Sequence, residues 1–349
     1  TRYIFMRKIF SHTFKDIISI DNLFKAWKEF ASDKKNKRDV LIFSSHLMDN
    51  IISLHQDLAN HSYKHGNYQA FKISDPKPRD IHKAIVRDRL LHHAIYRMLY
   101  PFFDKTFISD SFSCRLRKGT FKALDRFRKF GYKVSQSNRK TCYILKCDIR
   151  KFFANIDHEI LAGILQEHIY DKEVIGLMQE VIGSFSARTL EVGLPLGNLT
   201  SQLFVNIYMN KFDQFVKHKL KANYYIRYAD DFVIMSQDRK WLEEVLIKIG
   251  EFLRSELKLE LHPNKVSIET LASGIDFLGW VNFPDHKVLR TATKNRMFRN
   301  IKLKEWKDEV AQSYLGLLSH GNGGVLRCEL GKLINRSDFK KTLANLRAL

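Results

Sequence analysis

The chain is 349 residues long, and 44% of its residues are hydrophobic while 28% are charged. This balance excludes an intrinsically disordered chain, and the length predicts about two domains or one elaborated architecture. Lysine and arginine number 59 against 38 aspartates and glutamates, so that the formal net charge is +21. Such an excess argues against an acidic-surface enzyme of small metabolites. It favours a polyanionic partner, either nucleic acid or, less readily, an anionic membrane surface.

The cysteines and the apolar stretches argue against a secreted or membrane-spanning protein. Cys114, Cys142, Cys147 and Cys328 form no C-x-x-C pair and lack zinc-ligand spacing. Four cysteines are too few for a disulfide scaffold in a chain of this length, so we expect reduced thiols in a cytoplasmic protein. The sequence has no uninterrupted run of about 18 apolar residues, and it therefore predicts no transmembrane helix and no membrane partner.

The N-terminal region, residues 1–70, is predicted to be helical, because apolar residues recur there at helical spacing. Residues 34–38 form a basic run within it, which fits a solvated turn and a phosphate contact about equally well. Residues 77–81 are expected to form a turn that leads into a second helix over residues 85–99.

From residue 141 the pattern changes to alternating strands and helices. A buried strand ends at Asp148, and two strands joined by a tight turn surround Asp230 and Asp231. The order of elements is typical of a split βαβ unit with helices before and after it. The expected elements are a strand at 141–149, a helix at 158–182, the paired strands within 223–236, a helix at 241–257, short strands at 265–268, 275–279 and 281–283, and mostly helical, basic residues at 293–349.

Asp230 and Asp231 are unusual because they lie between two runs of β-branched and aromatic residues. Adjacent like charges at a hairpin need a partner, for which a divalent cation with oxygen ligands is suited; a simple aspartate-rich turn is the alternative. The position of Asp148 supports the cation site over the simple turn, because a carboxylate at the end of a buried strand also needs a partner. If these strands are neighbours, three carboxylates converge, as two-metal phosphoryl transfer requires. With the positive net charge, this indicates phosphoryl transfer to a nucleic-acid 3′-hydroxyl.

Seven ordered motifs resemble those of reverse transcriptases. Residues 228–231, Tyr-Ala-Asp-Asp, resemble the catalytic box, and residues 146–158 are similar to the first catalytic box of bacterial, group II intron-like enzymes. A lone Y-x-D-D is a weak signal, whereas seven boxes in order, from about Lys77 to Trp280, are very specific. The other boxes are residues 87–89 and 111–115 for the fingers, 193–202 for the template and nucleotide, and 259–265 and 277–280 for the two boxes that follow.

The resemblance implies an α+β fold: a right-hand polymerase with helical fingers, a ferredoxin-like split βαβ palm and a short helical thumb. The residues after Trp280 are expected to leave little room for an endonuclease, so that further functions come from partners. The expected domains are an N-terminal helical extension at 1–70, fingers at 71–140, a palm at 141–285 with a fingers-like insertion around 160–200, and the thumb at 286–349.

Within this family, the template box points to one class. Leu196 stands where other classes usually have glutamine, and Ser201 is followed by Gln202 where group II intron enzymes usually have proline. The pattern Gly-x-x-x-Ser-Gln from Gly197 resembles the reverse transcriptases of diversity-generating retroelements. It implies an RNA-directed DNA polymerase that copies a template RNA with frequent errors at adenines, so that the cDNA diversifies a target gene. It also implies a basic helical accessory variability protein as partner.

Three alternatives remain open at this stage. The first is a free-standing group II intron-like or antiphage-defence reverse transcriptase without adenine-specific errors. The second is a maturase-like RNA-binding module with an inactive palm, which would be expected to lose its acidic residues. The third is a basic protein of the membrane surface, which would be expected to carry a separate basic amphipathic helix.

The resemblance assigns roles to the residues around the carboxylates. Asp148 and Asp230 match metal ligands, the carbonyl of Ile149 is a further expected ligand, and Asp231 matches the adjacent acid. The implied cofactor is a pair of Mg²⁺ ions, with Mn²⁺ as a possible substitute. Lys265 matches a lysine that helps to protonate the leaving pyrophosphate.

The expected substrates are a template RNA, a nucleic-acid primer and deoxynucleoside triphosphates. Phe153 matches the steric gate, whose ring under C2′ excludes a 2′-hydroxyl, with a core position as the alternative. In an extended segment, only one of Phe153 and the adjacent Phe152 can face the site. Arg79 and Arg115 match fingers positions that hold the triphosphate, with a template-backbone contact or a surface charge as the alternative.

The remaining expected contacts belong to the template box and the primer grip. We expect Leu196 to loosen the selection of the nucleotide, because leucine can only pack where glutamine would form hydrogen bonds. The expected nucleotide contacts are Leu196 and Gly197, and the expected template and primer contacts are Gln202, Tyr228, Phe277, Leu278 and Gly279.

Overall fold

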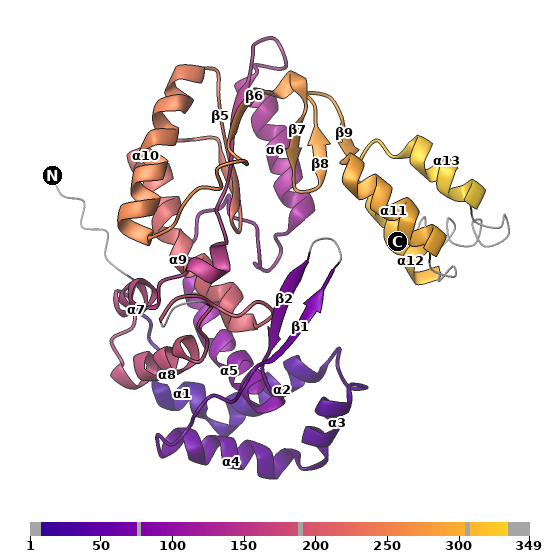
Figure 1. Ribbon diagram of the computed structural model, residues 1–349. Helices are drawn as coiled ribbons and strands as arrows, with labels where there is room; N and C mark the ends of the chain where they lie inside the picture. The colour runs from indigo at the N-terminus through magenta and orange to yellow at the C-terminus, as the bar shows by residue number, and fades with distance from the viewer. Residues whose placement is uncertain (1–7, 75–77, 188–190, 304–307, 334–349) are drawn as a thin grey trace.

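The computed structural model describes residues 8–74, 78–187, 191–303 and 308–333. Lys77 and the last part of the expected thumb, residues 334–349, lie outside this description. Figure 1 shows a helical base formed by the first part of the chain, a central sheet above it, and a group of helices at one side formed by the last part.

Four helices form the N-terminal base, as the apolar spacing predicts. The first begins with a capping box, in which the side chains of Thr13 and Asp16 each accept a hydrogen bond from the other residue's backbone N–H. Leu23, Ala26 and Phe30 are buried on one side of the second helix, which packs against α5 (Val86–Phe103). The helices of the base are α1 (Phe14–Ile18), α2 (Ile20–Ala31), α3 (Arg38–Ser45) and α4 (Leu47–Ala59).

A β-hairpin precedes α5, and it corrects the prediction of a simple turn within helical fingers. Strand β1 (Gln69–Ile73) pairs antiparallel with β2 (Arg79–Lys83), with Gln69 opposite Lys83. The side chains of β1 are all exposed, and those of β2 are exposed or half-buried. The hairpin therefore lacks the alternation of buried and exposed residues by which a strand is recognised in a sequence.

The central sheet has four strands in the order β4-β5-β3-β6, and every neighbouring pair is antiparallel. The strand order and the helices between the strands are those of the predicted ferredoxin-like split βαβ unit. Asp148 lies directly opposite Asp231 in the register of β3 and β5. The strands are β3 (Tyr143–Asp148), β4 (Tyr225–Tyr228), β5 (Asp231–Ser236) and β6 (Ser267–Thr270).

Helices cover both faces of this sheet, because its residues alternate between two cores. Leu145 and Cys147 belong to the larger core, together with residues of α9 and α10, whereas Ile144 belongs to a second core together with residues of α6. Figure 1 shows α10 and α6 on either side of the sheet. The helices of this part are α6 (Thr120–Val134), α7 (His158–Gln166), α8 (Lys172–Gly183), α9 (Leu199–Gln214) and α10 (Arg239–Leu257).

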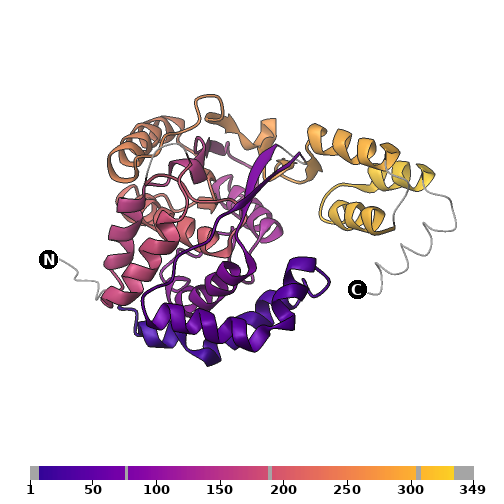
Figure 2. The same ribbon diagram turned by 60° about the horizontal axis from the view of Figure 1, so that its bottom comes forward.

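A second sheet, with the strand order β7-β8-β9, connects the central sheet to the C-terminal helices. The sequence predicts its first two strands and overlooks the third. Figures 1 and 2 both place α11, α12 and α13 together at one side of the molecule. The elements are β7 (Ile275–Phe277), β8 (Trp280–Asn282), β9 (Lys287–Leu289), α11 (Thr291–Leu303), α12 (Asp308–Leu318) and α13 (Gly324–Leu333).

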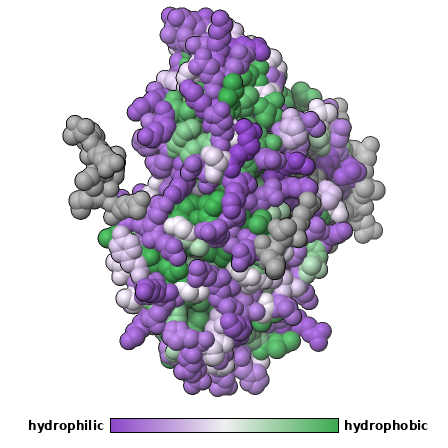
Figure 3. All heavy atoms as spheres, turned by 60° about the vertical axis from the view of Figure 1, so that its left-hand side comes forward, coloured by the Kyte–Doolittle hydropathy of each residue, from purple (hydrophilic) through white to green (hydrophobic). Residues whose placement is uncertain are grey.

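The visible surface is largely hydrophilic. Figure 3 shows the face that carries α10, where smaller apolar areas lie between hydrophilic side chains. In the part of the chain that the structure describes, no helix combines the length and the apolar character needed to cross a membrane.

Candidate active site

The tight turn between β4 and β5 carries the acidic pair. Tyr228 and Asp231 face each other across the two strands, so that Ala229 and Asp230 form the turn. Ala229 has a φ of 56°, a left-handed conformation that costs roughly 1–2 kcal/mol for a residue with a Cβ. The backbone N–H of Ile149 donates to the carbonyl of Asp230 at 3.1 Å, which ties this turn to the segment after β3.

The register of the sheet brings the three predicted carboxylates to one end. Asp148 is the last residue of β3 and lies opposite Asp231, the first residue of β5, next to Asp230. Lys265 Nζ lies 2.8 Å from Asp148 Oδ1. The structure thus places Asp148, Asp230, Asp231 and Lys265 together, although they come from segments far apart in the sequence.

Nearby cations do not offset the effects of burial and mutual repulsion on the pKa values of Asp230 and Asp231. Burial raises the pKa of Asp231 to about 7; Lys146 counteracts this rise, whereas Asp230 and Asp148 add to it. Burial, followed by the charge of Asp148, also raises the pKa of Asp230, and the charges of Lys265 and Arg79 oppose that shift. The Oδ1 atom of Asp231 is buried and has no hydrogen-bond partner.

The donor set fits hard divalent cations, because it consists of carboxylate and carbonyl oxygens that repel one another. An unpartnered buried oxygen on Asp231 is a further sign that positive charge belongs here. Within the described residues, no three histidine, cysteine, aspartate or glutamate side chains are arranged as a formed metal site. The assignment of Asp148, Asp230, Asp231 and the carbonyl of Ile149 as ligands of Mg²⁺ or Mn²⁺ therefore stays a prediction.

The template box lies against the β1–β2 hairpin. The backbone N–H of His82 in β2 donates to the carbonyl of Leu196 at 3.0 Å, and Asn198 Nδ2 donates to the carbonyl of His82 at 3.1 Å. Gly197 has a φ of 109°, and a Cβ there would lie 2.9 Å from a methyl group of Ile81. Glycine is thus required at this position for its backbone conformation and for the close approach of the hairpin.

Phe152 and Phe153 differ in exposure, although they do not lie in the extended segment that the sequence predicts. Both lie in the short 3₁₀ helix η1 (Phe152–Asn155); Phe152 is only 3% exposed, whereas Phe153 is half-buried. The carbonyl of Phe153 accepts a hydrogen bond from the backbone N–H of Leu194 at 2.8 Å. Phe153 therefore lies beside the template box.

Arg115 does not have the predicted position of a triphosphate ligand. Its side chain is 6% exposed, and Nε donates to Asp104 Oδ1 at 2.7 Å. Its Nη1 donates to the carbonyls of Ile108 and Ser111 and to the Ser111 hydroxyl, while Nη2 donates to the carbonyl of Asp104. Since all three nitrogens bind protein groups, Arg115 braces the loop that follows α5. This corrects its assignment as a nucleotide contact.

The primer-grip prediction also needs a correction. Phe277 is fully buried and its ring packs against that of Phe127 at 5.5 Å, so Phe277 belongs to the core and does not face solvent. Leu278 and Gly279 form the turn between β7 and β8, both with positive φ, and space beside Gly279 is open. The predicted primer contacts of Leu278 and Gly279 stay a prediction.

Tyr228 and Gln202 lie near the same end of the sheet. The Tyr228 hydroxyl accepts a hydrogen bond from Thr120 Oγ1 at 3.1 Å, and Tyr228 is half-buried next to the catalytic turn. Gln202 is in the first turn of α9 and is half-buried. The structure leaves both side chains accessible, and their predicted contact with template or primer stays a prediction.

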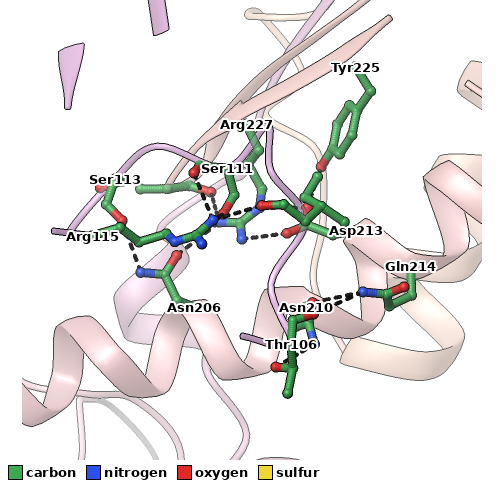
Figure 4. Close-up of polar contacts among 12 residues, drawn as sticks. Thr106, Ser111, Ser113, Arg115, Asn206, Asn210, Asp213, Gln214, Tyr225 and Arg227 are labelled. Carbon is green, nitrogen blue, oxygen red and sulfur yellow. Dashed lines mark hydrogen bonds and ion pairs between the residues drawn. The ribbon is translucent and has the colours of Figure 1, made fainter. Parts of the chain in front are cut away.

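A buried polar cluster, which the sequence did not predict, lies directly behind the turn. Figure 4 shows Arg227 between Asp213 and Asn206, with Tyr225 also directed at Asp213. Arg227 Nε and Nη2 each lie 2.7 Å from an oxygen of Asp213. The one available signal was an arginine inside a strand whose neighbours are apolar, a position at which a charge needs a buried partner.

Comparison with known proteins connects this geometry to one family. A family model described as "Reverse transcriptase (RNA-dependent DNA polymerase)" matches residues 72–281. Protein YkfC of Escherichia coli (strain K12) is 22% identical, in a match that covers 63% of this chain and 66% of that protein. The group II intron-encoded protein LtrA of Lactococcus lactis subsp. cremoris is 22% identical, in a match that covers 83% of this chain and 59% of LtrA. The chain thus spans less than two thirds of the length of these relatives.

The fold has solved counterparts. The structure of apo telomerase from Candida tropicalis matches with a TM-score of 0.53 at 12% identity, covering 80% of this chain and 61% of that one. This likeness concerns the fold alone, and it confirms the predicted α+β right-hand polymerase architecture. Because the family model matches well over half of the sequence, the chain belongs to the reverse transcriptase (RNA-dependent DNA polymerase) family.

Proposed function

We propose that this chain is an RNA-directed DNA polymerase that extends a primer with deoxynucleoside triphosphates along an RNA template. The observation that carries the proposal is the convergence of Asp148, Asp230 and Asp231 at one end of a split βαβ sheet, beside Lys265. Primer extension on an RNA template tests it directly. Incorporation of deoxynucleotides that requires both template and primer supports the proposal, and its absence under all metal and salt conditions contradicts it.

Each residue near the carboxylates has a specific task in this proposal. Asp148 and Asp230 hold two Mg²⁺ ions which, when bound, favour ionisation of the primer hydroxyl and neutralise the pyrophosphate. Lys265 lies beside Asp148, from where it can supply a proton to the leaving pyrophosphate. Phe153 restricts the space at C2′ of the incoming nucleotide, and Arg79 contacts its phosphates.

We further propose that the enzyme belongs to a diversity-generating retroelement and copies its template with errors at adenines. The support is the template box, in which Leu196 offers the nucleotide site an apolar side chain and a backbone carbonyl already bonded to His82. The accessory variability protein is part of this proposal. The alternative is an accurate group II intron-like or antiphage-defence enzyme, favoured by the likeness to the group II intron-encoded protein LtrA.

Replacement Leu196→Gln is expected to lower the error frequency opposite template adenine by about tenfold. A glutamine there would add hydrogen bonds that depend on correct geometry, and about 1.4 kcal/mol of discrimination corresponds to that factor. The measurement is sequencing of cDNA copied from an adenine-containing RNA. An error frequency opposite adenine that is low in the wild type, or unchanged in Leu196→Gln, would contradict the role of Leu196.

Arg79 and Arg115 are expected to respond differently to replacement by glutamine. Arg79→Gln should raise the KM for deoxynucleotides about tenfold without loss of stability, because an exposed strand residue loses one phosphate contact. Arg115→Gln should lower the stability by about 3 kcal/mol, because the Asp104 side chain and three carbonyls each lose a hydrogen bond from the guanidinium. Steady-state kinetics and urea unfolding of both variants check this; a normal stability of Arg115→Gln would restore the predicted nucleotide contact.

The exposed face of α6 is strongly basic. It carries Lys122, Arg128, Lys129 and Lys133, with Asp125 as the acidic residue among them. Because α6 begins beside Tyr228, where Thr120 contacts the hydroxyl, and rises about 1.5 Å per residue, these side chains lead away from the carboxylates. The face is therefore suited to the phosphate backbone of template RNA.

The exposed charges of α10 are balanced, in contrast to those of α6. The basic residues are Arg239, Lys240, Lys248 and Arg254, and the acidic residues are Glu243, Glu244, Glu251 and Glu256.

Removing charge from α6 is expected to weaken RNA binding and its salt dependence. The triple replacement Lys122→Gln, Lys129→Gln and Lys133→Gln should lower the slope of log Kd against log salt by about 2, since each lost phosphate contact contributes about 0.7–0.9. Fluorescence anisotropy with labelled template RNA measures it. The matched triple replacement on α10, at Lys240, Lys248 and Arg254, removes the same charge and should leave the slope nearly unchanged. Equal effects of both variants would mean that only net charge matters.

A further inference from the structure

Arg227 is a buried cation directly behind the catalytic turn. Its side chain is 1% exposed and that of Asp213 is fully buried. Nε and Nη2 bind the two carboxylate oxygens of Asp213, both at 2.7 Å, in a bidentate pair that Figure 4 shows. The Tyr225 hydroxyl donates to the same carboxylate at 2.7 Å. This pairing accounts for two of the three guanidinium nitrogens and leaves Nη1 for other partners.

The third nitrogen reaches the turn that carries Asp230. Nη1 donates to the carbonyl of Ala229 at 3.1 Å and to Asn206 Oδ1 at 3.4 Å. Ala229 is the left-handed residue of the turn, a conformation that must be held by contacts from outside. Because the carbonyl of Ala229 belongs to the peptide bond that leads into Asp230, a hydrogen bond at this atom restrains the orientation of the catalytic residue.

The backbone of Arg227 is held independently of its side chain. Its N–H donates to the carbonyl of Asp110 at 3.0 Å, and its carbonyl accepts from the N–H of Phe112 at 2.9 Å. Segment 110–112 thus extends the edge of β4 next to Arg227. These two bonds fix the backbone from which the guanidinium of Arg227 extends to the turn.

Helix α9 connects this cluster to the template box. Asn206 and Asp213 both belong to α9, whose first turn contains Gln202. Asn206 Nδ2 donates to the carbonyl of Gln202 at 3.2 Å and to the carbonyl of Ser113 at 3.0 Å. One helix therefore bears the template box at its start and holds Arg227 along its length.

We propose that Arg227 is a positioning residue, which holds the Ala229 carbonyl and thereby sets the orientation of Asp230 relative to the template box. A buried ion pair contributes little net stability compared with apolar residues of similar volume, so stability alone does not explain an arginine here. The inference rests on the proposed polymerase function, which it deepens by naming the part that keeps the catalytic turn in register with α9.

The test replaces the buried pair without leaving an unpaired charge. The triple variant Arg227→Met, Asp213→Leu and Tyr225→Phe removes the ion pair, the hydroxyl that depends on it, and the bond to Ala229. It is expected to fold with wild-type circular dichroism, because apolar side chains of similar size fill the space. In primer extension its kcat should fall roughly 10- to 100-fold while its KM for deoxynucleotides stays the same, as for a misplaced catalytic group.

A second readout does not depend on activity. Hydrogen–deuterium exchange of a peptide that spans residues 224–236 should become faster in the triple variant, while exchange in α10 stays unchanged. The control Arg97→Gln removes a remote arginine bound to Asn22 and Glu29, and it should alter neither the kcat nor the exchange of this peptide. If the triple variant folds less well, Arg227→Lys, which keeps one cation for Asp213 but lacks the fork, is measured in the same way and should show the same loss of kcat.

The outcomes separate this inference from the polymerase proposal. An inactive wild-type protein would contradict the proposed function, and the exchange measurement would still decide whether Arg227 holds the turn. An active wild type together with a folded triple variant of equal kcat and unchanged exchange would overturn the positioning role.

Discussion

Replacement of Asp230 by asparagine is expected to abolish primer extension, with a fall in kcat of roughly 1,000-fold or more. The amide has the shape of the carboxylate but lacks the charge that holds a divalent cation. The same replacement should leave the melting temperature equal or higher. Burial and the charge of Asp148 raise the pKa of Asp230, so at neutral pH ionisation of this group is less favourable in the folded than in the unfolded chain. Primer extension and thermal unfolding of one preparation measure both effects.

A matched surface variant distinguishes the role of Asp230 from a general effect of lost charge. Asp285, whose side chain is 78% exposed, interacts with the adjacent His286 in the loop between β8 and β9. Asp285→Asn should retain wild-type kcat. Synthesis by Asp230→Asn at a rate close to that of the wild type would show that this carboxylate is not part of the catalytic set.

Replacement of Phe153 by alanine is expected to increase the use of ribonucleotides relative to deoxynucleotides by about 10- to 200-fold. Phe153 is half-buried beside the template box, so removing its ring opens space in the site without emptying the core. The discrimination factor is the ratio of kcat/KM for a deoxynucleoside triphosphate to that for the matching ribonucleoside triphosphate, measured on the same primer and template.

Phe152 supplies the control for this experiment, because it is the neighbouring phenylalanine with the opposite exposure. It is 3% exposed and packs in the larger core. Phe152→Leu should lower stability by about 1 kcal/mol and leave the discrimination factor unchanged. A change in discrimination from Phe152→Leu, with none from Phe153→Ala, would exchange the two assignments.

The elements around the carboxylates were predictable because the strands are continuous runs of apolar, β-branched and aromatic residues, and the helix that follows repeats its apolar residues at helical spacing. The strand that ends at Asp148, the hairpin at Asp230 and the amphipathic helix that follows all have clear patterns, and the structure confirms them. The β1–β2 hairpin was not predictable in this way, because its exposed strands have no buried side that would impose alternation.

The two corrected site residues show where a motif stops being informative. A motif gives the position of Arg115 and Phe277 along the chain, whereas their roles depend on which way each side chain points. Arg115 turns inward to Asp104 and Ser111, and Phe277 turns inward to Phe127. The cluster of Arg227 could not be assembled either, since its carboxylate partner comes from a different secondary-structure element.

The register that sets Asp148 opposite Asp231 has an evolutionary consequence. Like charges directly opposite each other weaken an antiparallel pair, and burial makes the ionised form of Asp231 still less favourable. Neutral substitutions at this end of the sheet would therefore be favoured by selection for stability alone. A lineage that had ceased to use the site would be expected to lose these acids, because their replacement makes the sheet more stable. Retention of all three acids is therefore what we expect of a chain in which the carboxylates act together.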